Sequence, residues 1–191
     1  LSCFTVLLAL YKVSINRIAG LLDRVSNPMT SARFWNDATS AYLATTDAID
    51  SLWRRSGYST AGAFFLAFEF FSAACYGAIG FADWSGSGRI STWRPWCWAI
   101  KHFLLVCLSL YLVADMHSKC CSNRKAKHSV VYLARKHLGR MGPGCIQEHL
   151  AFIQCVESVP VGVESAFLPA LTMAFVAPVI RIAFVVAPLV V

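Results

Sequence analysis

The last stretch of the sequence, Val159–Val191, reads VPVGVESAFLPALTMAFVAPVIRIAFVVAPLVV and decides the fold class. It is almost wholly apolar, and Glu164 and Arg181 are its only charged residues. Because about 20 apolar residues in a helix cross the hydrocarbon core of a bilayer, this stretch is long enough to span one. Proline removes a backbone donor, so we expect the helix to be kinked or interrupted at Pro169, Pro178 and Pro188.

A charge within such a helix is costly unless it faces a partner, an aqueous path or the interface. Arg181 therefore has two interpretations. Either the helix lines something and Arg181 faces it, or a tilted, lipid-facing helix lets the long side chain reach the interface.

The composition of the whole chain agrees with this membrane interpretation. Hydrophobic residues make up 57% of the 191 residues and charged residues only 14%. Soluble domains carry about 25% charged and about 45–50% apolar residues, so the deficit of charge predicts an integral membrane protein. Leu1 lies within an apolar run, which predicts that the chain is the C-terminal part of a longer protein.

Apolar and charged segments alternate along the chain and predict an all-α, polytopic transmembrane helix bundle, with about three full spans and a partial first one. The expected order is a partial transmembrane span (1–11), cytoplasmic amphipathic helices (12–60), a transmembrane span (61–82), an extracellular loop (83–95), a transmembrane span (96–115), a basic cytoplasmic helical segment (116–158) and the final broken transmembrane helix (159–191). The final helix is expected to be the pore helix. Breaks are expected near Pro28 and at Gly139–Gly144. Ile146, Leu150, Ile153 and Val156 are expected to form the apolar face of the helix after the second break.

The distribution of basic residues predicts the orientation of the spans. Seven Lys and Arg residues lie between Asp115 and Ser158, whereas two lie between Asp83 and Pro95. Because cytoplasmic loops carry the excess of basic residues, the longer segment is placed inside and the C-terminus outside the cell. This clustering also explains the net charge of +7 without nucleic-acid binding.

Glu69 lies near the middle of the span 61–82. A carboxylate at that depth should face the interior of the bundle and is a functional-site hypothesis by default. The alternative is a protonated Glu69 that is hydrogen-bonded to a neighbouring helix for structural reasons. Both interpretations remain open at this stage.

The order of spans and long cytoplasmic helices resembles the C-terminal half of an arthropod gustatory receptor, from the insect chemoreceptor superfamily. Two stretches carry the resemblance, LYKVSINRIAGLL and the segment from His149 to the end of the chain. In the second stretch the matching positions are Phe152, Gln154, Val161, Ala166, Phe167 and Leu171. The Thr-Tyr and Gln-Phe pairs of the family's final helix are absent, and Arg181-Ile182 and Pro188-Leu189 stand in their places.

The resemblance implies a seven-span receptor of the plasma membrane that acts as a ligand-gated cation channel for small tastants or odorants. It also implies a homo- or hetero-tetramer, with the last helices around a pore and a ligand pocket in each subunit. A ring of apolar side chains that dewets closes such a channel. The candidate pore and gate residues are Arg181, Val185, Val186, Leu189 and Val190. Since Arg181 at the pore would repel cations, we expect it to turn into the subunit, toward Glu164 or Glu69.

Aromatic and polar residues in the two full spans are candidates for the ligand pocket, because small-molecule sites are apolar with a few polar groups. They are Glu69, Phe71, Tyr76, Trp98 and His102. Packing within the bundle is the alternative explanation for each of them.

Other functions are also compatible with the sequence. Glu69 and the broken final helix would suit a secondary transporter fragment, although we find no internal repeat. A non-conducting structural membrane protein is a further alternative. No enzymatic activity, cofactor or metal site is expected, because no catalytic or ligand motif stands out. The eight cysteines are expected to be free thiols rather than a disulfide framework.

Overall fold

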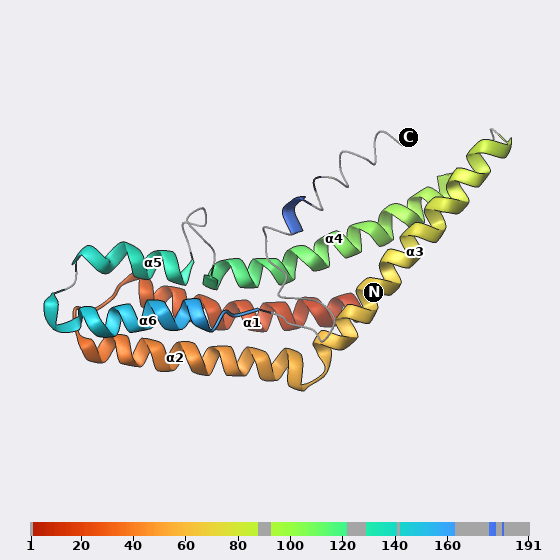
Figure 1. Cartoon of the computed structure of the whole chain (residues 1–191). Coiled ribbons are helices and arrows are strands. Elements are labelled where there is room, and N and C mark those ends of the chain that lie inside the picture. Colours follow the sequence, from red (N-terminus) through yellow and green to blue (C-terminus); the bar gives the residue numbers. More distant parts are fainter. Residues whose placement is uncertain are drawn as a thin grey trace.

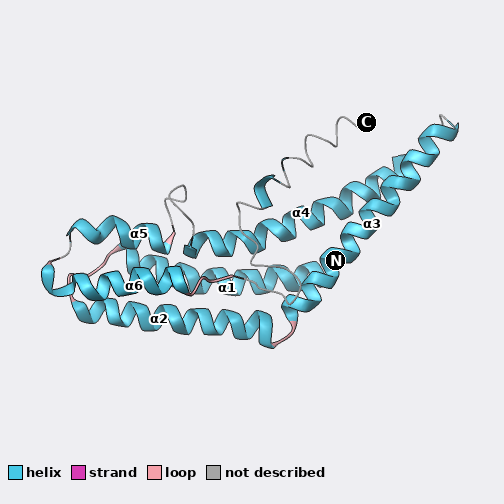
Figure 2. Cartoon of the chain, in the orientation of Figure 1, coloured by secondary structure: helices cyan, strands magenta, loops and turns pink. Residues whose placement is uncertain are grey.

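The computed structural model describes residues 2–87, 93–121, 129–140, 142–162, 176–178 and 181. Within these residues the chain is helical throughout, without a strand (Figure 2). The elements are α1 (Ser2–Ser26), α2 (Ala32–Asp50), the π-helical turn η1 (Ser51–Arg55), α3 (Tyr58–Ser87), α4 (Trp93–Cys121), α5 (Val130–His137), the 3-10 turns η3 (Leu138–Arg140) and η4 (Pro143–Cys145), and α6 (Ile146–Ser158). The all-α prediction is confirmed for the described part.

Three helices are long and apolar enough to cross a membrane, and they span Cys3–Ser26, Tyr58–Ala82 and Trp93–Cys121. These helices overlap the expected partial span and contain the two expected full spans. The chain is thus compatible with a membrane protein. Most of the expected final span lies outside the described residues.

Three helices extend beyond the boundaries expected for the membrane spans. α1 continues without a break from the apolar run at residues 1–11 to Ser26, because residues beyond Tyr11 keep a helical apolar periodicity. α3 reaches Ser87 and α4 begins at Trp93, so the expected loop 83–95 is largely helical at both ends. α1, α3 and α4 are therefore each longer than a bilayer requires and extend past the predicted span ends.

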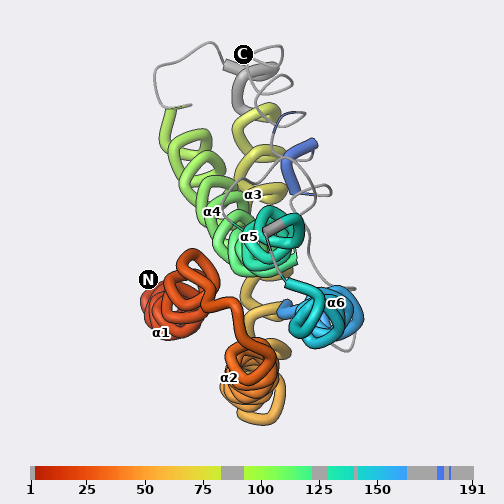
Figure 3. Tube along the Cα trace, turned by 90° about the vertical axis from the view of Figure 1, so that its left-hand side faces the viewer, coloured from red at the N-terminus to blue at the C-terminus, as the bar shows by residue number. Residues whose placement is uncertain are grey.

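Figure 1 shows an antiparallel pair, α3 and α4, whose upper ends project away from a bundle of the remaining helices. In that bundle α1 packs against α2 and α5, and α2 packs against α6. α1 also packs against α4 of the antiparallel pair. The end-on view of Figure 3 separates α1, α2 and α6 around the axis of the bundle, below α3 and α4. We call α3 and α4 the hairpin, and α1, α2, α5 and α6 the bundle.

Local sequence explains where the bundle helices begin. The Ser31 hydroxyl accepts a hydrogen bond from the Phe34 amide (3.2 Å) and caps α2. The Ser129 hydroxyl accepts one from the Tyr132 amide (3.1 Å) and caps α5. The breaks predicted near Pro28 and at Gly139–Gly144 are both present.

Aromatic residues of α2 and α6 make the centre of the bundle core. The fully buried Trp35 ring stacks on His149 at 3.8 Å between centroids, and Phe152 lies 5.4 Å from it. The Tyr42 ring meets Phe152 edge-on. These contacts join two helices that are more than a hundred residues apart in sequence.

The apolar face predicted for α6 is buried only in part. Ile153 and Val156 are buried, whereas Ile146 and Leu150 are exposed. α6 buries His149, Phe152, Ile153 and Val156, at the i, i+3, i+4, i+7 spacing of one helix face. The rings of Phe152 and His149 fit against Trp35, and this packing selects the face.

Candidate functional site

A carboxylate and an imidazole meet between the two helices of the hairpin. Glu69 on α3 and His102 on α4 are 6% and 8% exposed. The Glu69 Oε2 and His102 Nδ1 atoms lie 2.5 Å apart and share a hydrogen bond. Glu69 therefore faces the neighbouring helix, as its depth in the span predicts.

Two aromatic rings extend this pair toward the end of the hairpin. The Tyr76 ring lies parallel to the His102 ring, with centroids 5.7 Å apart and planes 7° from parallel. Trp98 lies 6.0 Å from both rings. The ammonium of Lys101 lies 4.2 Å from the centre of the Trp98 ring, within range of a cation–π interaction. We call Glu69, Tyr76, Trp98 and His102 the hairpin cluster.

Helix geometry explains which predicted pocket residues come together. Glu69 and Tyr76 are seven residues apart, about two turns, so they share one face of α3. Trp98 and His102 are four residues apart and share one face of α4. Phe71 lies about 200° around α3 from Glu69, and its side chain is 67% exposed. The structure thus does not bring Phe71 to the other four.

The hairpin cluster combines the chemical groups that a small-molecule site requires. Aromatic faces supply apolar contact and attract cations, and the Glu69–His102 pair supplies a hydrogen-bonding group within a low-dielectric interior. The pair contains both an acid and a base, so it can also hold or exchange a proton. The same contacts additionally hold α3 against α4.

The predicted pore and gate residues are hardly covered by the structure. Val185, Val186, Leu189 and Val190 lie outside the described residues. Arg181 is described and is exposed. The Glu69 carboxylate is paired with His102, and the expectation that Arg181 turns into the subunit stays a prediction. Glu164 lies outside the described residues.

A second polar group lies where the hairpin meets the bundle, and sequence reasoning missed it. The Tyr11 hydroxyl donates to the Asp115 carboxylate (2.7 Å), which joins the two positions predicted as the cytoplasmic ends of spans. At the same junction the Trp53 indole donates to the Ser14 hydroxyl (3.0 Å). Tyr and Trp favour membrane interfaces, and this preference is the sequence signal that could have revealed the group.

Two side chains tie the beginning of the final segment to this junction. The Tyr42 hydroxyl donates to the Val159 carbonyl (2.6 Å), and the His117 Nδ1 atom lies 3.0 Å from the Val161 carbonyl. Burial raises the pKa of the Tyr42 phenol, so it stays protonated and remains a donor. The position at which the chain enters the final segment is therefore fixed by α2 and α4.

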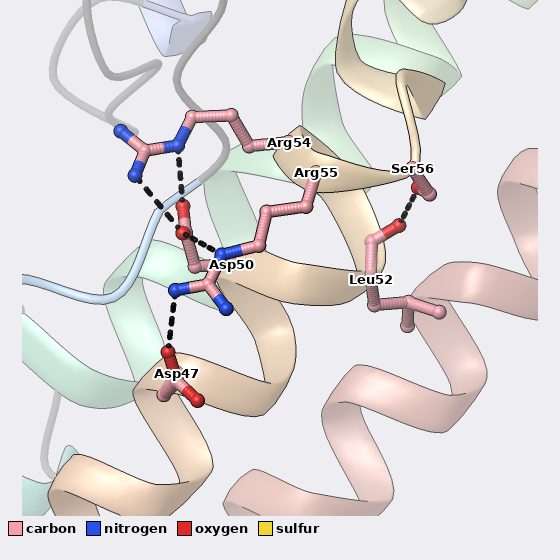
Figure 4. Close-up of polar contacts among 6 residues, drawn as sticks. All are labelled: Asp47, Asp50, Leu52, Arg54, Arg55 and Ser56. Atoms are coloured by element: carbon pink, nitrogen blue, oxygen red, sulfur yellow. Dashed lines mark hydrogen bonds and ion pairs between the residues drawn. The ribbon is translucent and has the colours of Figure 1, made fainter.

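Charged residues surround the turn that leads from α2 into α3 (Figure 4). The Arg54 Nε atom lies 3.0 Å from Asp50 Oδ1, and an Arg55 terminal nitrogen lies 3.0 Å from Asp47 Oδ1. Ser56 donates to the Leu52 carbonyl within the same turn. These four charged side chains and residues 158–162 line a cavity of about 550 Å³. The opposite charges balance, so the cavity has no strong preference for an anion or a cation.

Within the described residues, no group of three or more His, Cys, Asp or Glu side chains is placed to hold a metal ion. All eight cysteines are free, as predicted from their distribution.

Comparison with known proteins does not identify a family. No family model matches this chain, and no curated protein or solved structure matches it either.

Proposed function

We propose that this chain is part of a chemosensory receptor of the plasma membrane that acts as a ligand-gated cation channel for small molecules. The resemblance to gustatory receptors suggests a seven-span subunit in a tetramer, with the C-terminus outside the cell. In this proposal the hairpin cluster binds the ligand and the final segment lines the pore.

One observation carries the proposal. Four of the five residues chosen from the sequence as a ligand pocket lie together on facing sides of α3 and α4. They combine stacked rings with a buried acid–base pair, which is the composition expected of a site for a small molecule with one polar group.

The route from this site to the final segment is physically continuous. α4 carries His102 in the hairpin cluster and His117, about four turns further on, which contacts the Val161 carbonyl. A ligand that changes the spacing of α3 and α4 would shift α4 and so move the start of the final segment. Such coupling requires that the ligand binds the two arrangements with different affinity.

Recordings of cation currents test the proposal directly. Cells expressing the receptor that contains this chain are exposed to sucrose, caffeine and denatonium, and whole-cell currents are measured. For a compound that evokes a current, Tyr76→Ala should raise the half-maximal concentration about tenfold, since a stacked ring contributes about 0.5–1.5 kcal/mol beyond its buried area.

Phe71→Ala is the matched control, because Phe71 is an aromatic residue of the same helix that points away from the cluster. Its response should equal that of the unmodified receptor. Equal effects of the two variants would refute the hairpin cluster as the ligand site. Surface expression without any cation current for these compounds would count against the channel proposal.

The buried Glu69–His102 pair favours one second candidate, a proton-coupled transporter. Ionisable pairs at membrane depth form proton relays in such proteins. Uptake of a labelled substrate that follows an imposed pH gradient, and that Glu69→Gln abolishes, would favour the transporter over the channel.

A further inference from the structure

An apolar groove of about 200 Å³ lies between α1, η1 and the first turns of α3. Its lining includes Leu7, Leu10, Trp53, Tyr58, Gly62 and Phe65. Leu7 and Trp53 are buried and form the floor. The groove is separate from the hairpin cluster, and nothing in the proposed function uses it.

The groove has almost no polar character, although it contains an indole. The Trp53 Nε1 atom donates to the Ser14 hydroxyl, so the polar atom of this side chain is satisfied by α1. Gly62 leaves the wall open, because a Cβ atom built there meets no atom within 4 Å. A ligand of this groove would therefore be recognised by shape and apolar contact alone.

The position of the groove identifies the kind of occupant. It lies between two of the helices that are apolar enough to cross a membrane, α1 and α3. It begins at the level of Trp53 and Tyr58, two residue types that favour the interface, and continues along the span past Leu10 and Phe65. Exposed apolar side chains border it on both helices, namely Val6, Phe64 and Phe68. A bilayer around these spans would present acyl chains at the opening of the groove.

Its size agrees with a hydrocarbon segment. An apolar cavity of about 150 Å³ stays dry and binds a molecule as large as benzene, so this groove can take a short length of hydrocarbon chain. A water molecule would find too few polar partners here to be stable.

We infer that the groove between α1 and α3 is a binding site for one acyl chain of a membrane phospholipid. This acyl chain enters from the leaflet nearest the junction and lies against Leu7 and Leu10. The contact is specific to the groove, unlike the general contact between lipid and the exposed face of α3.

Photolabelling with a phosphatidylcholine that carries a diazirine in one acyl chain tests this inference. The full chain is reconstituted in phosphatidylcholine vesicles and irradiated, and the labelled residues are mapped by mass spectrometry. We expect labelling to be enriched at Val6, Leu10 and Phe65 relative to other exposed apolar residues such as Phe70 and Ile100.

Gly62→Leu should remove the enrichment, because the new side chain fills the groove. Gly77→Leu is the matched control on the same helix, since a Cβ atom there also meets nothing within 4 Å, away from the groove. Both changes replace glycine with a stronger helix former, so their effects on helix stability are comparable. Circular dichroism of both variants checks that they fold.

Two results would overturn the inference. Uniform labelling of all exposed apolar residues would mean that the groove holds no lipid of its own. Labelling of Phe70 and Ile100 without any labelling in the groove would mean that a polypeptide segment occupies it.

Discussion

The bundle and the hairpin differ in where their large apolar side chains and their charged side chains lie. In the bundle, Trp35 and Phe152 are fully buried and the charged side chains of α2 lie outside. In the hairpin, the largest apolar residues of α3 are exposed, and Glu69 and His102 are buried between the helices. Each arrangement lowers the free energy in only one solvent, since water favours buried apolar groups and lipid favours buried polar groups. The comparison teaches that one continuous chain is adapted to two solvents.

The junction is where we expect the change from lipid to water. Tyr11 and Asp115 are joined there, and Trp53 binds Ser14. From the junction toward the tip of the hairpin the exposed surface of α3 is aromatic, whereas on the side of the bundle the helices are amphipathic. α1 and α4 run through this level without a break, whereas α2 ends and α3 begins beside it, on either side of Trp53.

The largest expected effect comes from truncating the bundle core. Trp35→Ala should lower the free energy of unfolding by about 4 kcal/mol, because it removes a fully buried ring from His149 and Phe152. Phe71→Ala removes an exposed ring of the hairpin and should have little effect. Unfolding by urea in detergent micelles, followed by circular dichroism, measures both. Similar losses of unfolding free energy for the two variants would contradict the difference between the bundle and the hairpin.

The second-largest expected loss of stability separates a buried hydrogen-bonded pair from a buried apolar pair. His102→Leu leaves Glu69 buried without its partner and should destabilise the hairpin by about 3 kcal/mol. Combining it with Glu69→Leu should restore most of the stability, because two apolar side chains replace the pair. Resistance of the hairpin to unfolding by sodium dodecyl sulfate reports both changes. A double variant as unstable as the single one would show that the pair itself stabilises the fold.

A smaller loss of stability is expected from a substitution where the two hairpin helices approach closely. A Cβ atom at Gly80 would lie 2.8 Å from the Nε1 atom of the Trp96 ring, too close for an ordinary contact. Gly80→Ala should therefore cost about 2 kcal/mol through overpacking. Gly77→Ala, one turn earlier and unobstructed, should be neutral or stabilising. The same unfolding assay in sodium dodecyl sulfate compares the two, and a neutral Gly80→Ala would contradict the packing seen here.

The smallest expected effect is a dependence of bundle stability on pH. Burial lowers the pKa of His149 below its usual 6.5. Its Nε2–H donates to the Ala134 carbonyl (2.9 Å), and Nδ1 has no hydrogen-bond partner within the described part of the chain. Since the unfolded chain then binds more protons below pH 6.5, bundle stability should fall as the pH drops through 6.5 toward the folded pKa. One proton limits the slope to about 1.4 kcal/mol per pH unit.

His149→Phe keeps a flat ring against Trp35 but cannot bind a proton, so it provides the control for this prediction. Its stability between pH 7 and pH 5 should lack the part of the slope that belongs to His149. An unchanged slope would assign the pH dependence to other groups.

The sequence predicted the helices and their breaks because these depend on local signals. Pro28 and Gly139–Gly144 interrupt helices wherever they occur, and the composition of the spans is independent of their neighbours. The buried face of α6 was predicted only in part, because apolar residues lie on more than one side of it. Only the fit of Phe152 against Trp35, on a helix far away in sequence, decides which side is buried.

The candidate site could likewise be predicted only in part. Depth in the span and apolar surroundings pointed to Glu69, and helical spacing from Glu69 could have excluded Phe71. The pairing of Glu69 with His102 could not be predicted, because it depends on how α3 and α4 are aligned along their length. The junction contacts depend on the same alignment.

Accessibility of single cysteines to a membrane-impermeant maleimide most directly tests the central claim that the hairpin lies in lipid and that α2 of the bundle lies in water. In a cysteine-free chain reconstituted in vesicles that are permeabilised to the reagent, Asp37→Cys on α2 and Phe71→Cys on α3 are compared, because both positions are exposed. We predict rapid labelling at Asp37→Cys, and labelling at Phe71→Cys only after detergent is added. Equal labelling of the two in intact bilayers would contradict the account.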